Sequence, residues 1–135
     1  MIEIDPCRLN KIIIQLQETA NERDAVANAR LTAAIFFKGS IIATGGNQRK
    51  SHPFQLKYAR NEDSIFLHAE TDAIKNSLRF IDIDDLKKSA LIVCRVKANG
   101  TLALAKPCDG CQRAIANFNI QHVYYTTNEG EVKYL

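Results

Sequence analysis

The stretches LHAETDAI (67–74) and KPCDGCQRAI (106–115) decide how this chain is organised. Each is predicted to begin a helix, because apolar residues recur at helical spacing directly after its polar residues. His68 falls in the first turn of one helix, and Cys108 and Cys111 fall in the first turn of the other. The two cysteines are three residues apart, so both thiols project from one helix face. The fold has to bring two helix starts together for these side chains to act as one group.

The chemistry of these side chains indicates a zinc site. One imidazole and two thiolates suit Zn²⁺, and a fourth position left to water separates a catalytic zinc from a structural one. The positive end of a helix dipole lowers the pKa of Cys108 and Cys111, which favours the thiolate that metal requires. Glu70 lies two residues beyond His68, where it is placed to move protons without binding the metal. The pattern predicts Zn²⁺ held by His68, Cys108 and Cys111, with Glu70 as the catalytic residue.

Two other interpretations of the same residues stay open. A Cys-x-x-Cys pair is also typical of thioredoxin-like redox sites, although this leaves His68 and Glu70 without a role. A purely structural zinc needs a fourth protein ligand. The histidines and cysteines that remain to supply one are His52, His122, Cys94 and Cys7.

The composition is that of one globular domain spanning residues 1–135. The chain is 46% hydrophobic and 24% charged, so long disordered segments are not expected. Its formal charge of +3 does not predict a nucleic-acid binder, although it suits an anionic small substrate. No apolar run approaches the roughly 20 residues that a membrane span requires.

The four cysteines and the start of the chain together indicate a reducing environment. The first residues, MIEIDPCRLNKIII, show no basic segment followed by an apolar core, so no secretory signal is recognised. We therefore expect a cytoplasmic protein in which close cysteines bind metal rather than form disulfides. Cys7 and Cys94 lie in apolar-patterned segments and are predicted to be core or boundary residues.

The remaining segments predict alternating helices and strands. Asp5 is expected to cap a first helix that starts at Pro6 and ends in the polar run 21–24. Nearly continuous apolar runs around Lys38-Gly39 predict a hairpin of two strands covered on both faces. The polar stretch 47–64 is predicted to be a functional loop. The full predicted order is helix 6–20, strands 31–37 and 41–47, helix 68–79, strand 90–96, helix 108–118, and strands 122–127 and 131–135, the last two antiparallel.

His-Ala-Glu followed by Pro-Cys-Asp-Gly-Cys resembles the signature of the cytidine and deoxycytidylate deaminase superfamily. The resemblance implies a three-layer α/β/α cytidine deaminase-like fold around a five-stranded mixed sheet. The implied strand order is 2-1-3-4-5, with the last strand antiparallel. It also implies a homo-oligomer, either a dimer or a tetramer. The zinc would lie between the starts of the second and third helices.

The expected substrate contacts lie after the second strand. In the family, an asparagine at this place often contacts the sugar or base, and Asn47 falls there; a turn residue with left-handed backbone is the other interpretation. Ala69, between the metal ligand and the proton shuttle, is a further candidate. Arg49, Lys50 and His52 follow directly and suit a 5′-phosphate, or are solvated charges on a loop.

The resemblance implies hydrolytic deamination of a cytosine nucleoside or nucleotide (cytidine, deoxycytidine or dCMP) to its uracil counterpart. One alternative is a catalytically retired, zinc-stabilised module that binds nucleotides. Another is a deaminase of adenine or guanine, on a nucleoside or in RNA. Single-stranded nucleic acid is disfavoured as a substrate, because no broad basic and aromatic platform is evident.

Overall fold

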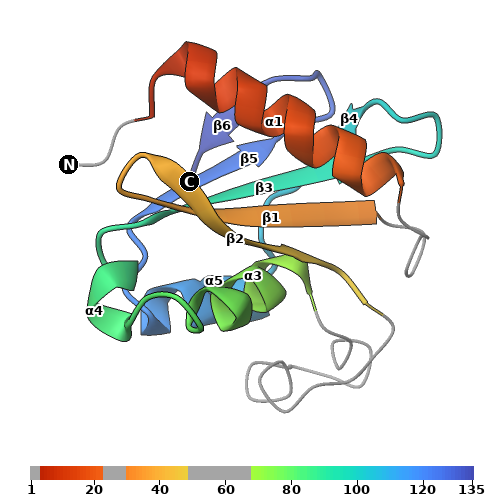
Figure 1. The fold of residues 1–135 in the computed structure, drawn as a ribbon. Coiled ribbons are helices and arrows are strands. Elements are labelled where there is room, and N and C mark those ends of the chain that lie inside the picture. The colour runs from red at the N-terminus through yellow and green to blue at the C-terminus, as the bar shows by residue number, and fades with distance from the viewer. Residues whose placement is uncertain (1–3, 23–29, 49–67) are drawn as a thin grey trace.

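The computed structural model describes residues 4–22, 30–48 and 68–135, and these form three layers (Figure 1). Helix α1 (Pro6–Asn21) packs on one face of a central sheet, against β1 (Arg30–Phe37) and β3 (Ala90–Val96). The opposite face carries α3 (Ala69–Ser77) and α5 (Asp109–Asn117), side by side in Figure 1 and in contact with each other. The predicted three-layer α/β/α class is confirmed.

The sheet is mixed and runs in the order β2-β1-β3-β5-β6. β3 and β5 are parallel, whereas β2 is antiparallel to β1, β1 to β3, and β6 to β5. This is the predicted 2-1-3-4-5 order with an antiparallel last strand. A sixth, unpredicted strand, β4, pairs with the end of β3, and therefore the strand numbering shifts by one after β3. The other strands are β2 (Ser40–Gly46), β4 (Leu102–Ala103), β5 (His122–Thr126) and β6 (Val132–Tyr134).

The hairpin strands differ in how fully they are covered. β1 is an inner strand between β2 and β3, and its residues from Thr32 onward are buried, as predicted. β2 is an edge strand whose residues range from buried at Ala43 and Gly46 to exposed at Ser40 and Thr44, so it is covered less fully than predicted. Its side chains still reach the cores on both faces, because Ile41 packs against the cluster under α1 and Ile42 against the cluster under α3 and α5.

Helix α1 begins and packs as its sequence predicts. The side chain of Asp5 accepts a hydrogen bond from the Arg8 backbone N–H, and Pro6 occupies the first helical turn. The buried residues recur at helical spacing, which places one apolar stripe on the sheet. These residues are Ile12, Ile13, Leu16 and Ala20.

The core on the opposite face lies between the sheet and α3 and α5. Ile74 and Ile115 are buried there and the half-buried Phe118 packs against the same core, whereas Leu78 at the end of α3 is exposed. The acidic run after α3 forms a one-turn helix, α4 (Ile83–Leu86). Its start is closed by a reciprocal capping box between Asp82 and Asp85.

The two cysteines outside the second motif have different environments. Cys94 is fully buried in β3, as predicted, whereas Cys7 is exposed in the first turn of α1. A core or boundary place is therefore wrong for Cys7, because the apolar stripe of α1 begins only after it. Over the described ranges, none of the helices is both long enough and apolar enough to cross a membrane.

Candidate metal centre

The two motif stretches form the starts of neighbouring helices. His68 is the N-cap of α3 and Cys108 is the N-cap of α5, both with extended backbone. The His68 carbonyl accepts the Asp72 N–H at 2.9 Å, and the Cys108 carbonyl accepts the Gln112 N–H at 2.8 Å. These bonds begin each helix at its motif residue. The packing of α3 on α5 then brings the two helix starts together, as the sequence predicts.

One imidazole nitrogen and two sulfur atoms converge there. The Nδ1 atom of His68 lies 3.2 Å from Sγ of Cys111 and 3.6 Å from Sγ of Cys108. All three ligand atoms lie within 4.8 Å of one another. Usual zinc bond lengths in a tetrahedron place nitrogen and sulfur about 3.6 Å apart, and two sulfurs about 3.8 Å apart. The donor set and its spacing therefore fit Zn²⁺.

The protons of this group are shared unequally. Hydrogen bonds from Cys111 and then His68 lower the pKa of Cys108 to about 3, so its thiol is ionised at neutral pH. The same bond to Cys108, together with burial, raises the pKa of Cys111 far above its ordinary value. Hydrogen bonding to Cys108 also raises the pKa of His68. The Cys108 thiolate thus accepts hydrogen bonds from protonated Cys111 and His68, and a bound cation would take the place of those protons.

Glu70 lies in the first turn of α3 and is only 4% exposed. Burial is the main reason why the pKa of its carboxyl group is raised. Its own backbone N–H and the charge of His68 act in the opposite direction. A buried carboxyl group with a raised pKa, next to a metal-ligand set, is suited to take up and release protons during a reaction.

The other proposed ligands within the described ranges lie in different environments. Cys94 is inside β3, where burial raises its pKa to about 12, and Cys7 is exposed on α1. His122 Nδ1 lies 2.6 Å from the Tyr134 hydroxyl at the start of β5. Among the described residues, the ligand group contains only His68, Cys108 and Cys111. His52, the remaining candidate, lies outside those residues.

Asn47 follows β2 directly and is buried. Its Oδ1 accepts the Leu31 N–H at 3.1 Å, and its own N–H donates to the Leu31 carbonyl at 3.4 Å. Asn47 does not have positive φ, so the left-handed turn interpretation is wrong. Ala69, the first residue of α3, is fully buried. The predicted contacts Arg49, Lys50 and His52 and the loop prediction beyond residue 48 lie outside the described residues.

Two residues that the motifs do not indicate join β2 to α3. A Cβ atom at Gly45 would lie 2.3 Å from the Ala73 backbone nitrogen, so only glycine permits this close approach. The Oδ2 atom of Asp72 accepts the Gly46 N–H at 3.1 Å and the Gln48 side-chain amide at 3.2 Å. The one available signal for Asp72 is its position four residues after His68, on the same helix face.

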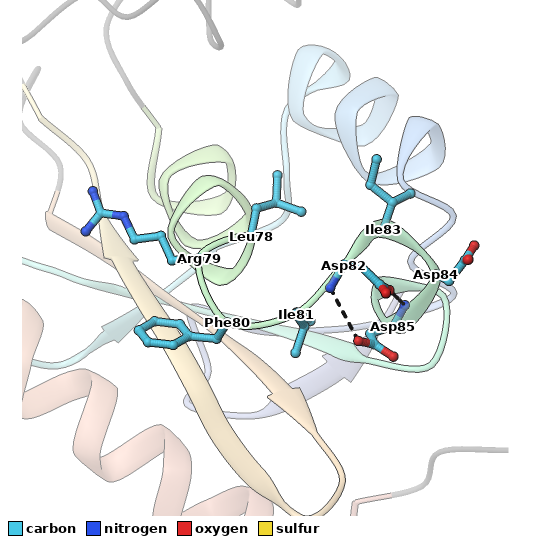
Figure 2. A pocket seen from close by; sticks show the side chains of 8 residues that line it. All are labelled: Leu78, Arg79, Phe80, Ile81, Asp82, Ile83, Asp84 and Asp85. Atoms are coloured by element: carbon cyan, nitrogen blue, oxygen red, sulfur yellow. Dashed lines mark hydrogen bonds between the residues drawn. The ribbon is translucent and has the colours of Figure 1, made fainter.

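An open hollow lies at the other end of α3 and is separate from the metal ligands (Figure 2). It is lined by residues 78–85, which connect α3 to α4 and form α4. In Figure 2, Arg79 and Phe80 point to one side of this segment, away from Ile83 and Asp84. His68 lies at the opposite, N-terminal end of α3.

Comparison with solved structures shows the same fold. The dCMP deaminase of cyanophage S-TIM5 superposes with a TM-score of 0.58 at 22% identity, over 94% of this chain and 89% of that one. Cytidine deaminase from Burkholderia pseudomallei gives 0.62 at 17% identity, over 93% and 90%. A structure from a study of tRNA:A34 deaminases and A-to-I editing gives 0.55 at 23%, over 90% and 75%.

A comparison with curated proteins finds no match. The model of the cytidine and deoxycytidylate deaminase zinc-binding region, however, matches residues 8–127. That match includes every residue of the ligand group, and the three side chains suit the zinc that defines the region. The chain therefore belongs to the cytidine and deoxycytidylate deaminase family.

Proposed function

We propose that this protein hydrolytically deaminates a cytosine nucleoside or nucleotide, namely cytidine, deoxycytidine or dCMP. The observation that carries the proposal is the buried Glu70 carboxyl group next to the convergent His68, Cys108 and Cys111. A structural zinc site has no need of such a carboxyl group, because burying it costs free energy. A hydrolytic site needs one to move protons.

Each residue has a distinct role in the proposed reaction. His68, Cys108 and Cys111 would hold Zn²⁺, which when bound would lower the pKa of water and so supply a nucleophile at neutral pH. Glu70 would accept a proton from the attacking water and deliver protons to the ring nitrogen and the departing amine. The C4–N bond of cytosine breaks and a C4–O bond forms, so water and substrate become the uracil product and ammonia.

The substrate side of the site is proposed to lie at the end of β2. Asn47 and Ala69 would contact the nucleoside, and Arg49, Lys50 and His52 would bind a 5′-phosphate, which favours dCMP. The S-TIM5 enzyme has also been solved in complex with dCMP and dUMP. Assembly as a homo-oligomer and a reducing, cytoplasmic setting are parts of the same proposal.

The test is a deamination screen of zinc-loaded protein against nucleosides, mononucleotides and single-stranded nucleic acid. We expect conversion of a cytosine nucleoside or nucleotide, and loss of conversion in Glu70→Ala with the zinc content unchanged. Full turnover by Glu70→Ala would contradict the proposed mechanism.

The same screen separates the alternatives. Metal-loaded protein that binds pyrimidine nucleotides but converts no base would identify a retired binding module. Selective conversion of adenine or guanine, free or in RNA, would keep the chemistry and reassign the substrate. Turnover of dCMP but not of deoxycytidine would support a phosphate-binding role for residues 49–52.

A further inference from the structure

We propose that Asp72 is a positioning residue, which holds the end of β2 in register with the helix that carries His68 and Glu70. This inference rests on the proposed function, because it assigns the end of β2 to the substrate. Asp72 is 4% exposed, lies two residues beyond Glu70 and belongs to neither His-Ala-Glu nor Pro-Cys-Asp-Gly-Cys. Its buried carboxylate therefore needs an explanation of its own, because a buried charge is retained only where it is compensated.

The compensation comes mostly from the strand end. Oδ2 of Asp72 accepts the Gly46 backbone N–H at 3.1 Å and the Gln48 side-chain amide at 3.2 Å. Oδ1 pairs with Lys75 on the same helix at 3.3 Å. Two hydrogen bonds thus reach from α3 to the residues on either side of Asn47. Hydrogen bonds to a charged acceptor are stronger than neutral ones, so the carboxylate is a firm anchor.

Asn47 is anchored from the opposite side as well. Its Oδ1 and its backbone N–H both bond to Leu31 of β1. Residues 46–48 are therefore fixed between β1 and the first turns of α3, and Gly45 allows the two backbones to approach closely. A shift of this segment changes the distance between Asn47 and Glu70 without moving any metal ligand.

Loss of the Asp72 side chain should weaken substrate binding much more than it slows turnover. Asp72→Ala should raise KM between about ten- and a hundredfold while kcat falls much less, because a displacement near 1 Å is enough for effects of this size. Asp72→Asn should restore most of the affinity, since its side-chain oxygen can accept the same two hydrogen bonds. Zinc content should equal that of the wild type in both variants.

Two matched controls separate positioning from general loosening. Lys75→Gln removes the ion pair at Oδ1 and leaves the bonds at Oδ2 in place. Asn76→Ala removes another bond from α3 to β2, the 2.9 Å bond to the Thr44 carbonyl, which lies further from the strand end. Both controls should keep KM within about threefold of the wild type, because neither removes a hydrogen bond from Asp72 to Gly46 or Gln48.

The experiment combines steady-state kinetics on the substrate that the wild type converts, calorimetric binding of dUMP, and NMR amide exchange at Gly46. Asp72→Ala should weaken dUMP binding and accelerate Gly46 exchange, and Asp72→Asn should reverse both effects. Equal losses in Asn76→Ala and Asp72→Ala would overturn the proposal, as would an unchanged KM with only a lowered Tm. If Asp72→Ala does not fold, Gln48→Ala, which removes one of the two bonds, must raise KM.

Failure of the proposed function gives a different result. A wild type that converts no base in the screen rejects deamination, while dUMP binding and Gly46 exchange still report on Asp72. Binding of dUMP that is insensitive to Asp72→Ala, with accelerated Gly46 exchange, would show that the anchor exists but does not serve the ligand, and would overturn the positioning role.

Discussion

The Nδ1 atom of His68 lies 3.2 Å from the Sγ atom of Cys111, although 43 residues separate them in the chain. One belongs to the start of α3 and the other to the first turn of α5. A cation bound to both side chains therefore connects two helices that pack on the same face of the sheet. Loss of this cation should affect stability as well as activity.

Replacing Cys111 by Ser should weaken zinc binding by more than about a hundredfold, because loss of even an outer-shell partner costs ten- to hundredfold. With zinc present, the Tm of the Cys111→Ser variant should fall to the Tm of the wild type after chelation. Zinc content by elemental analysis and calorimetric titration measure this. Cys7→Ser is the matched control, since Cys7 is exposed on α1, and it should retain the metal.

Acidification should release the zinc. His68 and both thiols bind metal only when deprotonated, so protons compete with zinc as the pH falls. The raised pKa values of His68 and Cys111 strengthen this competition, because both groups regain protons readily. Zinc affinity should therefore increase with pH across the neutral range. An affinity that does not vary with pH would contradict the assigned ligand set.

Glu70→Gln should lower the activity of the protein and raise the stability of its zinc-free form. Turnover should fall by about a hundredfold or more, because general acid–base catalysis contributes that much. Burial raises the pKa of Glu70, so its ionised form is disfavoured in the folded state. The stability associated with the protonated form is present below the unfolded pKa and is lost as the pH rises through the folded pKa. The chelated variant should therefore have a higher Tm at neutral pH than the chelated wild type.

The sequence predicts the individual helices and strands and the ligand group well because each depends on a local pattern, whereas the layers and the strand order are implied only by the family resemblance. Helical and strand periodicity identify α1, β1 and β3, and the motif residues coincide with helix starts. The apolar run of β2 does not itself reveal whether the strand acquires a second neighbour, and only the order implied by the resemblance places β2 at an edge.

The connection between β2 and α3 is invisible in the sequence for a related reason. Gly45 is required by the Ala73 backbone, and Asp72 is compensated by Gly46 and Gln48. Each contact joins residues more than twenty positions apart, and an aspartate on a helix normally predicts an exposed side chain. The two-residue strand β4 is also missed, because it exists only through its pairing with Arg95 and Val96.

Gly45→Ala should destabilise the protein by about 1–3 kcal/mol or more, the usual cost of overpacking a tight contact. The added Cβ would lie 2.3 Å from the Ala73 nitrogen and 2.7 Å from the Ala69 carbonyl oxygen, both of which are backbone atoms. Relief requires α3 to move away from β2, which displaces His68. Urea denaturation measures the loss, and zinc affinity should fall in parallel.

Thr44→Ala is the control for that substitution, because the neighbouring Thr44 side chain is exposed on the same strand. Its free energy of unfolding should stay within about 0.5 kcal/mol of the wild type. A Gly45→Ala variant that is as stable as Thr44→Ala would show that α3 and β2 do not pack backbone against backbone.

A thiol reagent should modify the four cysteines in an order that is set by their environments. At about pH 8 a thiol reacts through its thiolate. The pKa sets how much thiolate is present, and the exposure of the sulfur sets whether the reagent can reach it. In zinc-loaded native protein only the exposed Cys7 should react, because Cys108 and Cys111 would bind metal and Cys94 is fully buried. A chelator should add Cys108, which is exposed and has its pKa lowered to about 3.

Cys94 should react only on unfolding, when all four thiols become accessible. Burial raises its pKa to about 12, so the folded protein keeps this proton while the unfolded chain releases it above about pH 9. The stability contributed by Cys94 is thus complete below the unfolded pKa and declines as the pH rises toward the folded one. Labelling of Cys94 at the rate of Cys7 in native protein would place it outside β3, and labelling of Cys108 that is indifferent to the chelator would remove it from the ligand set.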